Sequence, residues 1–194
     1  VPAAEKSTLA RRSLGIGYIG LAHYLAKQGL KYDDPEAWKA VHDLSESFQY
    51  NLLKSSNAIA KEKGACEYFS RTKYSEGILP IDTYKRDIDE FCGTELSYDW
   101  DSLRNDIQEF GLRHSTLSAQ MPSESSSVVS NATNGIEPPR AFLSTKKSKK
   151  GPLKQIVPQF NSFKNNYTLL WDMKDNDGYI TVSYTHLRAH ETST

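Results

Sequence analysis

Residues 111–140 read GLRHSTLSAQ MPSESSSVVS NATNGIEPPR, and this stretch decides how the rest of the chain is interpreted. Apolar and polar residues alternate within Thr116–Met121, as a short strand with one buried face requires. Pro122 ends that strand, and Ser123–Ser126 supplies N-cap residues for a helix that continues into two valines. The stretch therefore predicts a strand, a tight serine-rich turn and the start of a helix.

The serine-rich turn is a candidate anion site. The first N–H groups of a helix have no partner within the helix, and the helix dipole favours negative charge beside them. Serine hydroxyls add further donors without adding bulk. Seven residues of the stretch are serine, however, and such an excess is also typical of a linker. A phosphate-binding turn and a plain capped turn both remain open from these residues alone.

Three helices are expected before this stretch. The first spans residues 13–29, where Gly29 is a plausible C-cap and where Gly15 and Gly17 would let another backbone approach closely. Its apolar stripe consists of Leu14, Leu21, Ala22, Leu25 and Ala26.

The second helix begins at Asp34-Pro35 and ends at Gly64, because proline suits the first turn and glycine suits the end. Its apolar residues recur at mostly helical steps and are Trp38, Val41, Leu44, Phe48, Leu52 and Ile59. The third helix runs from Trp100 to Phe110 behind an Asp99 cap, with Leu103, Ile107 and Phe110 on its buried face. His42 and His114 are interpreted as packed or hydrogen-bonding residues and not as catalytic bases.

A β-hairpin and a fourth helix are expected after the quoted stretch. The hairpin spans Ala141–Pro158, and its turn at 146–151 carries four lysines in five residues. A solvated hairpin tip explains these lysines better than a nucleic-acid site. The fourth helix is expected over Ser162–Met173.

Composition excludes several classes of protein. The 194 residues carry 24 basic and 24 acidic side chains, so no one-signed field favours a nucleic-acid partner. No apolar run approaches the roughly 20 residues that span a bilayer, so no membrane partner is expected. Two cysteines, with no CxxC and no His/Cys cluster at metal-ligand spacing, indicate a reduced cytoplasmic protein without a metal site.

Several motifs, in the same order along the chain, resemble the large (alpha, catalytic) subunit of class I ribonucleotide reductase, most closely the bacterial class Ia type. Pro122–Ser126, continued by Ser130–Arg140, carries the resemblance most specifically. It extends from about residue 10 to about residue 180 and includes Arg12–Gly17, Tyr24–Lys27, Ala60–Cys66, Gly77–Lys85 and Asn176–Tyr179.

The resemblance implies a fold and an activity. The fold class is α/β, and residues 1–182 would be a helix-rich, C-terminal portion of a ten-stranded α/β barrel domain. The activity is the reduction of ribonucleoside diphosphates to 2′-deoxyribonucleoside diphosphates by radical chemistry, for DNA synthesis. In the family the matching turn binds the substrate diphosphate, which assigns that role to Pro122, Ser123, Glu124, Ser125 and Ser126.

The family's radical cysteine lies in an Asn-x-Cys-x-Glu motif that this sequence lacks. Cys66 and Cys92 stand in other contexts and are expected to be buried small residues. We therefore expect no catalytic residue and no bound cofactor in this segment, which would be inactive alone. The radical-generating metal would belong to the small (beta) subunit, and ATP and deoxynucleotide effectors would bind elsewhere in the large subunit.

The implied partners are the substrate, the small subunit, a second large subunit, and thioredoxin or glutaredoxin. Residues 183–194 depart abruptly from the family pattern and are interpreted as a non-native, adaptor-like tail. One rival hypothesis is a helical interaction module without catalysis, in which Ser115–Ser130 is a regulated linker and would be disordered or phosphorylated. Another is a glycyl-radical or adenosylcobalamin-dependent reductase on the same barrel, for which so long a match is not expected.

Overall fold

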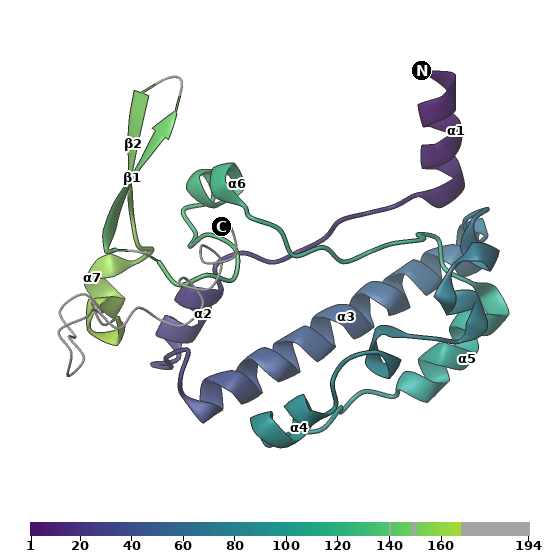
Figure 1. Cartoon of the computed structure of the whole chain (residues 1–194), viewed down its shortest axis with the longest axis horizontal. Helices are drawn as coiled ribbons and strands as arrows, with labels where there is room; N and C mark the ends of the chain where they lie inside the picture. The colour runs from purple at the N-terminus through teal and green to yellow at the C-terminus, as the bar shows by residue number, and fades with distance from the viewer. Residues whose placement is uncertain (140, 149–150, 168–194) are drawn as a thin grey trace, which may run out of the picture. The chain divides into compact units, whose positions relative to one another are not determined.

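The computed structural model describes residues 1–139, 141–148 and 151–167, which form two compact units. The first unit comprises Val1–Gly17 and Asp33–Met121, and the second comprises Tyr18–Tyr32 and the described residues that follow Met121 (Figure 1). Parts of the predicted hairpin turn and fourth helix, and all of the predicted tail, lie outside the described residues. Within the described ranges, no helix has the length and apolar character needed to cross a membrane.

The long helix of the first unit is α3, Pro35–Lys63, and it confirms the prediction at both ends. Asp34 occupies the N-cap position in extended conformation, and Pro35 starts the helix. At the other end the Gly64 N–H donates to the Ala60 carbonyl at 2.8 Å, with Gly64 at φ 79°. Positive φ favours glycine, which explains why the helix ends there.

Helix α5, Trp100–Phe110, is also confirmed. Its cap is Asp99, whose Oδ1 accepts from the Ser102 N–H at 3.0 Å. It packs against α3 in the first unit (Figure 1). Leu103 and Ile107 are buried as expected, whereas Phe110 is 40% exposed. The core of this unit consists of Leu53, Leu79, Ile81, Trp100, Leu103, Ile107, Leu112 and Leu117.

The remaining elements of the first unit are short. They are α1 (Pro2–Arg11), α4 (Asp87–Cys92) and the 3-10 turns η1 (Phe69–Arg71), η2 (Lys73–Glu76) and η3 (Pro80–Asp82).

The predicted buried face of α3 is partly wrong. Among the expected apolar residues Ile59 is 36% exposed, and the others are only partly buried. The buried residues of the helix are instead Ala37, Glu46, Leu53, Ser56, Asn57 and Ala60. Three of these are polar, so hydrophobic periodicity does not reveal the face that packs. Asn57 shows why it can be buried, because its Nδ2 donates to the carbonyls of Asp106 and Gly111 at 3.0 and 2.9 Å.

The first predicted helix, residues 13–29, is wrong over its first half. Residues 13–17 run beside 116–119 in a parallel bridge between Ile16 and Ser118. Ile16 N–H donates to the Leu117 carbonyl at 2.8 Å, and Ala119 N–H donates to the Ile16 carbonyl at 3.0 Å. The predicted strand near 116–121 therefore exists as this short pairing. The predicted role of Gly17 is confirmed, because a Cβ there would collide with the Ala119 carbonyl oxygen.

The second unit contains helix α2, Leu21–Lys27, which is the confirmed half of that first predicted helix. The hairpin is confirmed as β1 (Leu143–Ser148) and β2 (Gly151–Ile156), antiparallel with Leu143 opposite Ile156. The predicted fourth helix begins earlier, as α7 (Phe160–Phe163), and continues as a 3-10 turn, η4 (Lys164–Asn166). Tyr167 is extended, so the predicted helix is wrong at that residue.

The described residues are thus rich in helix and poor in strand, with β1 and β2 forming a two-stranded sheet. This agrees with a helix-rich α/β segment. The turn that carries the candidate site lies in the second unit, where helix α6, Glu124–Val129, follows Pro122 and Ser123.

Candidate functional site

The serine-rich turn is the first turn of α6 and the residues just before it. Ser123 is the N-cap residue, and its carbonyl accepts from the Ser127 N–H at 2.7 Å. Pro122, Ser125 and Ser126 are exposed, whereas Ser127 is 0% exposed. The helix is therefore anchored at Ser127 and presents Ser125 and Ser126 to solvent.

The Ser123 side chain is already engaged within the protein. Asn134 Oδ1 accepts from the Ser123 N–H at 3.0 Å and from the Ser123 hydroxyl at 3.2 Å. The Ser123 Oγ in turn accepts from the Gly135 N–H at 2.9 Å. We call these three hydrogen bonds the Ser123–Asn134 latch. They join the start of α6 to a segment that lies 11 residues further along the chain.

The segment that carries Asn134 is itself held on both sides. The Thr133 carbonyl accepts from the Gly20 N–H at 3.1 Å, and the Ile136 carbonyl accepts from the Tyr32 hydroxyl at 2.8 Å. From the hairpin, Gln155 Nε2 donates to the Ala132 carbonyl at 3.0 Å. Burial raises the pKa of Tyr32, so its hydroxyl stays protonated and remains a donor. The latch is thus built on a fixed support.

The arrangement suits an anion more than a cation. The first N–H groups of a helix point away from its body, and exposed Ser125 and Ser126 add hydroxyl donors next to them. Of the predicted site residues, Ser125 and Ser126 thus have free access to a ligand, whereas Ser123 is part of the latch. Sequence reasoning missed Asn134 and Gly135. Only their place in the matching motif could have drawn attention to them.

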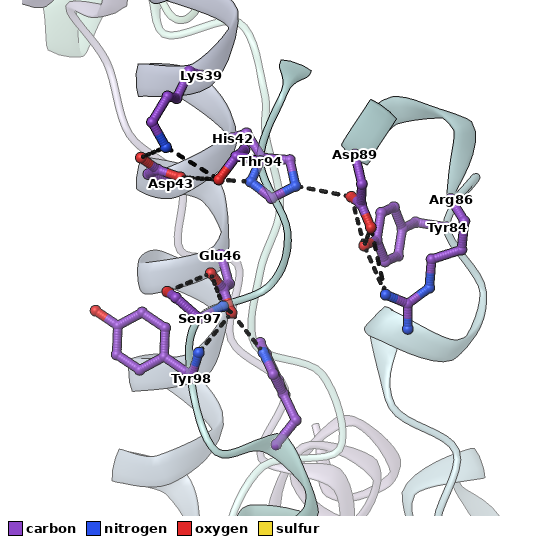
Figure 2. A network of polar contacts seen from close by, with 11 residues as sticks. Lys39, His42, Asp43, Glu46, Tyr84, Arg86, Asp89, Thr94, Ser97 and Tyr98 are labelled. Atoms are coloured by element: carbon purple, nitrogen blue, oxygen red, sulfur yellow. Dashed lines mark hydrogen bonds and ion pairs between the residues drawn. The ribbon is translucent and has the colours of Figure 1, made fainter. Parts of the chain in front are cut away.

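A second polar cluster lies in the first unit, around Glu46 on α3 (Figure 2). Its carboxylate accepts from the Ser97 N–H at 2.8 Å, the Tyr98 N–H at 3.0 Å and Trp100 Nε1–H at 2.9 Å. Burial alone would raise the pKa of Glu46, but these hydrogen bonds outweigh it and hold the pKa below its ordinary value. Glu46 is 6% exposed, so it ties the loop before α5 to α3 and is not available to a ligand.

His42 belongs to a chain of polar contacts that joins α3 to α4 (Figure 2). Its Nε2 lies 2.9 Å from Asp89 Oδ1, and the Tyr84 hydroxyl donates to Asp89 Oδ2 at 2.7 Å. Burial, together with this bond to Asp89, raises the pKa of Tyr84 to about 12. The His42 side chain is 6% exposed, which confirms the prediction of a packed histidine.

The other predicted structural residues have similar roles. His114 Nδ1 lies 2.9 Å from the Ser56 hydroxyl, as expected for a hydrogen-bonding residue, and burial lowers its pKa. Cys66 is buried as predicted, whereas Cys92 is half-buried. Burial raises the pKa of both thiols, and a protonated thiol is a poor nucleophile.

The family model for the ribonucleotide reductase barrel domain matches residues 1–192 of the chain. The chain belongs to the ribonucleotide reductase family. The resemblance inferred from the motifs is thereby confirmed, and it covers both units of the described structure.

Individual members of the ribonucleotide reductase family are also similar to the chain. The ribonucleoside-diphosphate reductase subunit alpha of Haemophilus influenzae is 61% identical over 180 residues, which are 93% of this chain. The reductase 1 subunit alpha of Escherichia coli is 54% identical over 182 residues, or 94% of the chain. The subunit alpha of phage T4 is 46% identical over 183 residues, or 93% of the chain. In each case the match spans 24% of the relative's length.

Proposed function

We propose that this chain is a segment of the catalytic subunit of a class I ribonucleoside-diphosphate reductase. The complete subunit would reduce ribonucleoside diphosphates to 2′-deoxyribonucleoside diphosphates. Identity of 54–61% to bacterial subunits named for this activity supports the proposal. The segment would form the C-terminal portion of the ten-stranded barrel in residues 1–182, with 183–194 as a non-native tail.

The contribution of this segment would be the turn that binds the substrate diphosphate, Pro122–Ser126. The observation that carries this assignment is the different environment of neighbouring serines. The Ser123 hydroxyl is hydrogen-bonded within the protein and Ser127 is buried, whereas Ser125 and Ser126 are exposed on the first turn of α6. A plain capped turn has no need of two exposed hydroxyls beside outward-pointing N–H groups, but a diphosphate has many oxygens to pair with them.

The chemistry of reduction would lie outside this segment. Its two cysteines have raised pKa values and match no radical or dithiol motif, so neither is assigned to electron transfer. We expect the radical to come from the small subunit, and the electrons to come from thioredoxin or glutaredoxin through cysteines elsewhere. A second large subunit completes the expected assembly, in the cytoplasm.

The rival hypothesis of a regulated linker predicts a disordered or phosphorylated Ser115–Ser130. Leu117 is instead 3% exposed and Ser127 is 0% exposed, and residues 116–119 pair with 13–17. Packed side chains and backbone pairing of this kind are not expected of a linker. We therefore do not propose a linker function.

The test is made in the complete alpha subunit that contains this segment. Replacing Ser125 and Ser126 together by Ala removes two hydroxyl donors and keeps the backbone N–H groups. Hydrogen bonds to a charged partner are worth about 1.5–3 kcal/mol each, so affinity for ribonucleoside diphosphates should fall by at least about tenfold. Calorimetry with all four diphosphates measures this, and the loss should be similar for each base because it concerns the diphosphate.

Ser162→Ala is the matched control, because Ser162 is an exposed serine of the same unit on α7. It should leave every affinity unchanged. If the Ser125→Ala/Ser126→Ala variant binds all four diphosphates normally, the turn is only a cap and the site assignment fails.

A further inference from the structure

We infer that Asn134 is the positioning residue of the diphosphate turn, holding Ser123 so that the donors that follow it face the ligand. The inference rests on the proposed function of Pro122–Ser126. It assigns a role to a residue outside that turn, and it removes the Ser123 hydroxyl from the set of donors that contact the diphosphate.

The hydrogen bonds of the latch carry the argument. An amide oxygen has two lone pairs, and Asn134 Oδ1 uses them for the Ser123 N–H at 3.0 Å and the Ser123 hydroxyl at 3.2 Å. A hydroxyl has one proton to donate, so the Ser123 hydroxyl has none left for a phosphate oxygen while this bond stands. Its Oγ also accepts from the Gly135 N–H at 2.9 Å, which fixes the rotamer from the other side.

The consequence for the turn is geometric. With both its N–H and its hydroxyl engaged, Ser123 defines where α6 begins, and the carbonyl of Ser123 then receives the Ser127 N–H. The donors left for an anion are the backbone N–H groups of residues 124–126 and the exposed hydroxyls of Ser125 and Ser126. Asn134 is thus not a ligand of the diphosphate, and it acts through Ser123.

The choice of an amide is also informative. Aspartate has the same shape and would accept the same two hydrogen bonds, but it would place a negative charge next to a site for a dianion or trianion. The two charges would repel each other, and this repulsion is screened by salt when the site is open to solvent. Asparagine supplies the acceptor without the charge. Asn134→Ala and Asn134→Asp should therefore differ in how their diphosphate affinity responds to salt.

The experiment measures cytidine diphosphate affinity of the complete alpha subunit by calorimetry at about 0.05 M and about 0.5 M salt, where the screening length falls from roughly 14 Å to roughly 4 Å. Asn134→Ala should weaken binding about tenfold relative to the unmodified protein, as expected when hydrogen bonds that hold a site are removed, at both salt concentrations. The affinity of Asn134→Asp should be reduced at low salt. At high salt it should recover to within about threefold of the affinity of the unmodified protein, because the aspartate keeps the acceptor oxygen. Asn161→Ala, an exposed asparagine on α7, is the control and should bind normally.

Normal binding by Asn134→Ala would overturn the inference. So would an Asn134→Asp variant that stays at least about tenfold weaker at high salt, since the retained oxygen would then have no effect. If Asn134→Ala does not fold, the salt response of Asn134→Asp still decides. Ser125→Ala/Ser126→Ala is measured alongside. If the double serine variant loses affinity while Asn134→Ala binds normally, only the role of Asn134 is refuted. If the double serine variant binds normally, the diphosphate turn itself is refuted.

Discussion

The Glu46 cluster of the first unit and the Ser123–Asn134 latch of the second both use a side-chain oxygen to hold a bend of the chain. They differ in whether hydrogen-bond donors next to them remain available to a ligand. Around Glu46 a buried carboxylate takes up the donors of the loop before α5, including Ser97 and Trp100. The latch uses a neutral amide, and Ser125 and Ser126 just after it remain exposed.

This difference separates a structural polar cluster from the proposed binding site. A buried negative charge must accept hydrogen bonds from nearby donors, and those donors are then not available to a ligand. A neutral latch costs less to bury and does not repel an anion. Burial and charge alone therefore do not mark a binding site. A better sign is a group of exposed hydrogen-bond donors next to backbone that is held in place by other contacts.

The largest expected effect is that of Glu46→Ala on stability. The substitution leaves the N–H groups of Ser97, Tyr98 and Trp100 Nε1 without their acceptor. Trp100 Nε1 is a buried donor, and an unsatisfied buried donor costs roughly 1–3 kcal/mol, whereas the Ser97 and Tyr98 N–H groups are only partly buried and add less, so we expect a loss of about 3 kcal/mol in the free energy of unfolding. Chemical denaturation of the complete subunit, followed at the tryptophans, measures it. Glu62→Ala on the same helix, where the side chain is exposed, should cost little, and an equal loss in both variants would contradict the account.

The second prediction is the pH dependence of that contribution. The pKa of Glu46 is lower in the folded protein than its ordinary value of 4.5, so the unfolded chain binds a proton more readily. The stabilisation is therefore complete above pH 4.5 and is lost as the pH falls through the lower folded pKa. The stability difference between the unmodified protein and Glu46→Gln should shrink on acidification from pH 7 over this range, and thermal unfolding measures it. A difference that stays constant with pH would show that the charge contributes nothing.

Local signals in the sequence predict the long helices well. α3 and α5 follow from an N-cap aspartate at one end and a glycine at the other, and both ends require only neighbouring residues. The pairing of residues 13–17 with 116–119 joins segments far apart in the chain, and the apolar residues Leu14 and Ile16 look equally suited to a helix. Sequence periodicity cannot separate these two outcomes.

The candidate site divides in the same way. The turn at 122–126 can be predicted because Pro122 and the serines act locally on the start of α6. Asn134 cannot, because its role depends on a bond to Ser123 that only the folded chain creates. Glu46 is missed for a further reason: a charged residue on a helix is expected to face solvent, and its burial depends on donors from another element.

The smallest expected effect is that of Ser125→Ala/Ser126→Ala on stability. Both side chains are exposed, and exposed polar side chains contribute little to folding. The free energy of unfolding should change by no more than about 0.5 kcal/mol, even though diphosphate affinity falls. Denaturation of this variant beside Glu46→Ala checks the contrast. A stability loss of several kcal/mol would mean that these serines are structural, like Glu46.

The central claim is that the diphosphate is held by Ser125, Ser126 and the N–H groups of the first turn of α6, beside an intact latch. A crystal structure of the complete subunit with a ribonucleoside diphosphate tests it directly. We expect phosphate oxygens about 2.7–3.2 Å from those N–H groups and from a Ser125 or Ser126 hydroxyl, with the Ser123 hydroxyl still bonded to Asn134. A diphosphate bound away from this turn would contradict the account, and so would a Ser123 hydroxyl that leaves Asn134 to contact the phosphate.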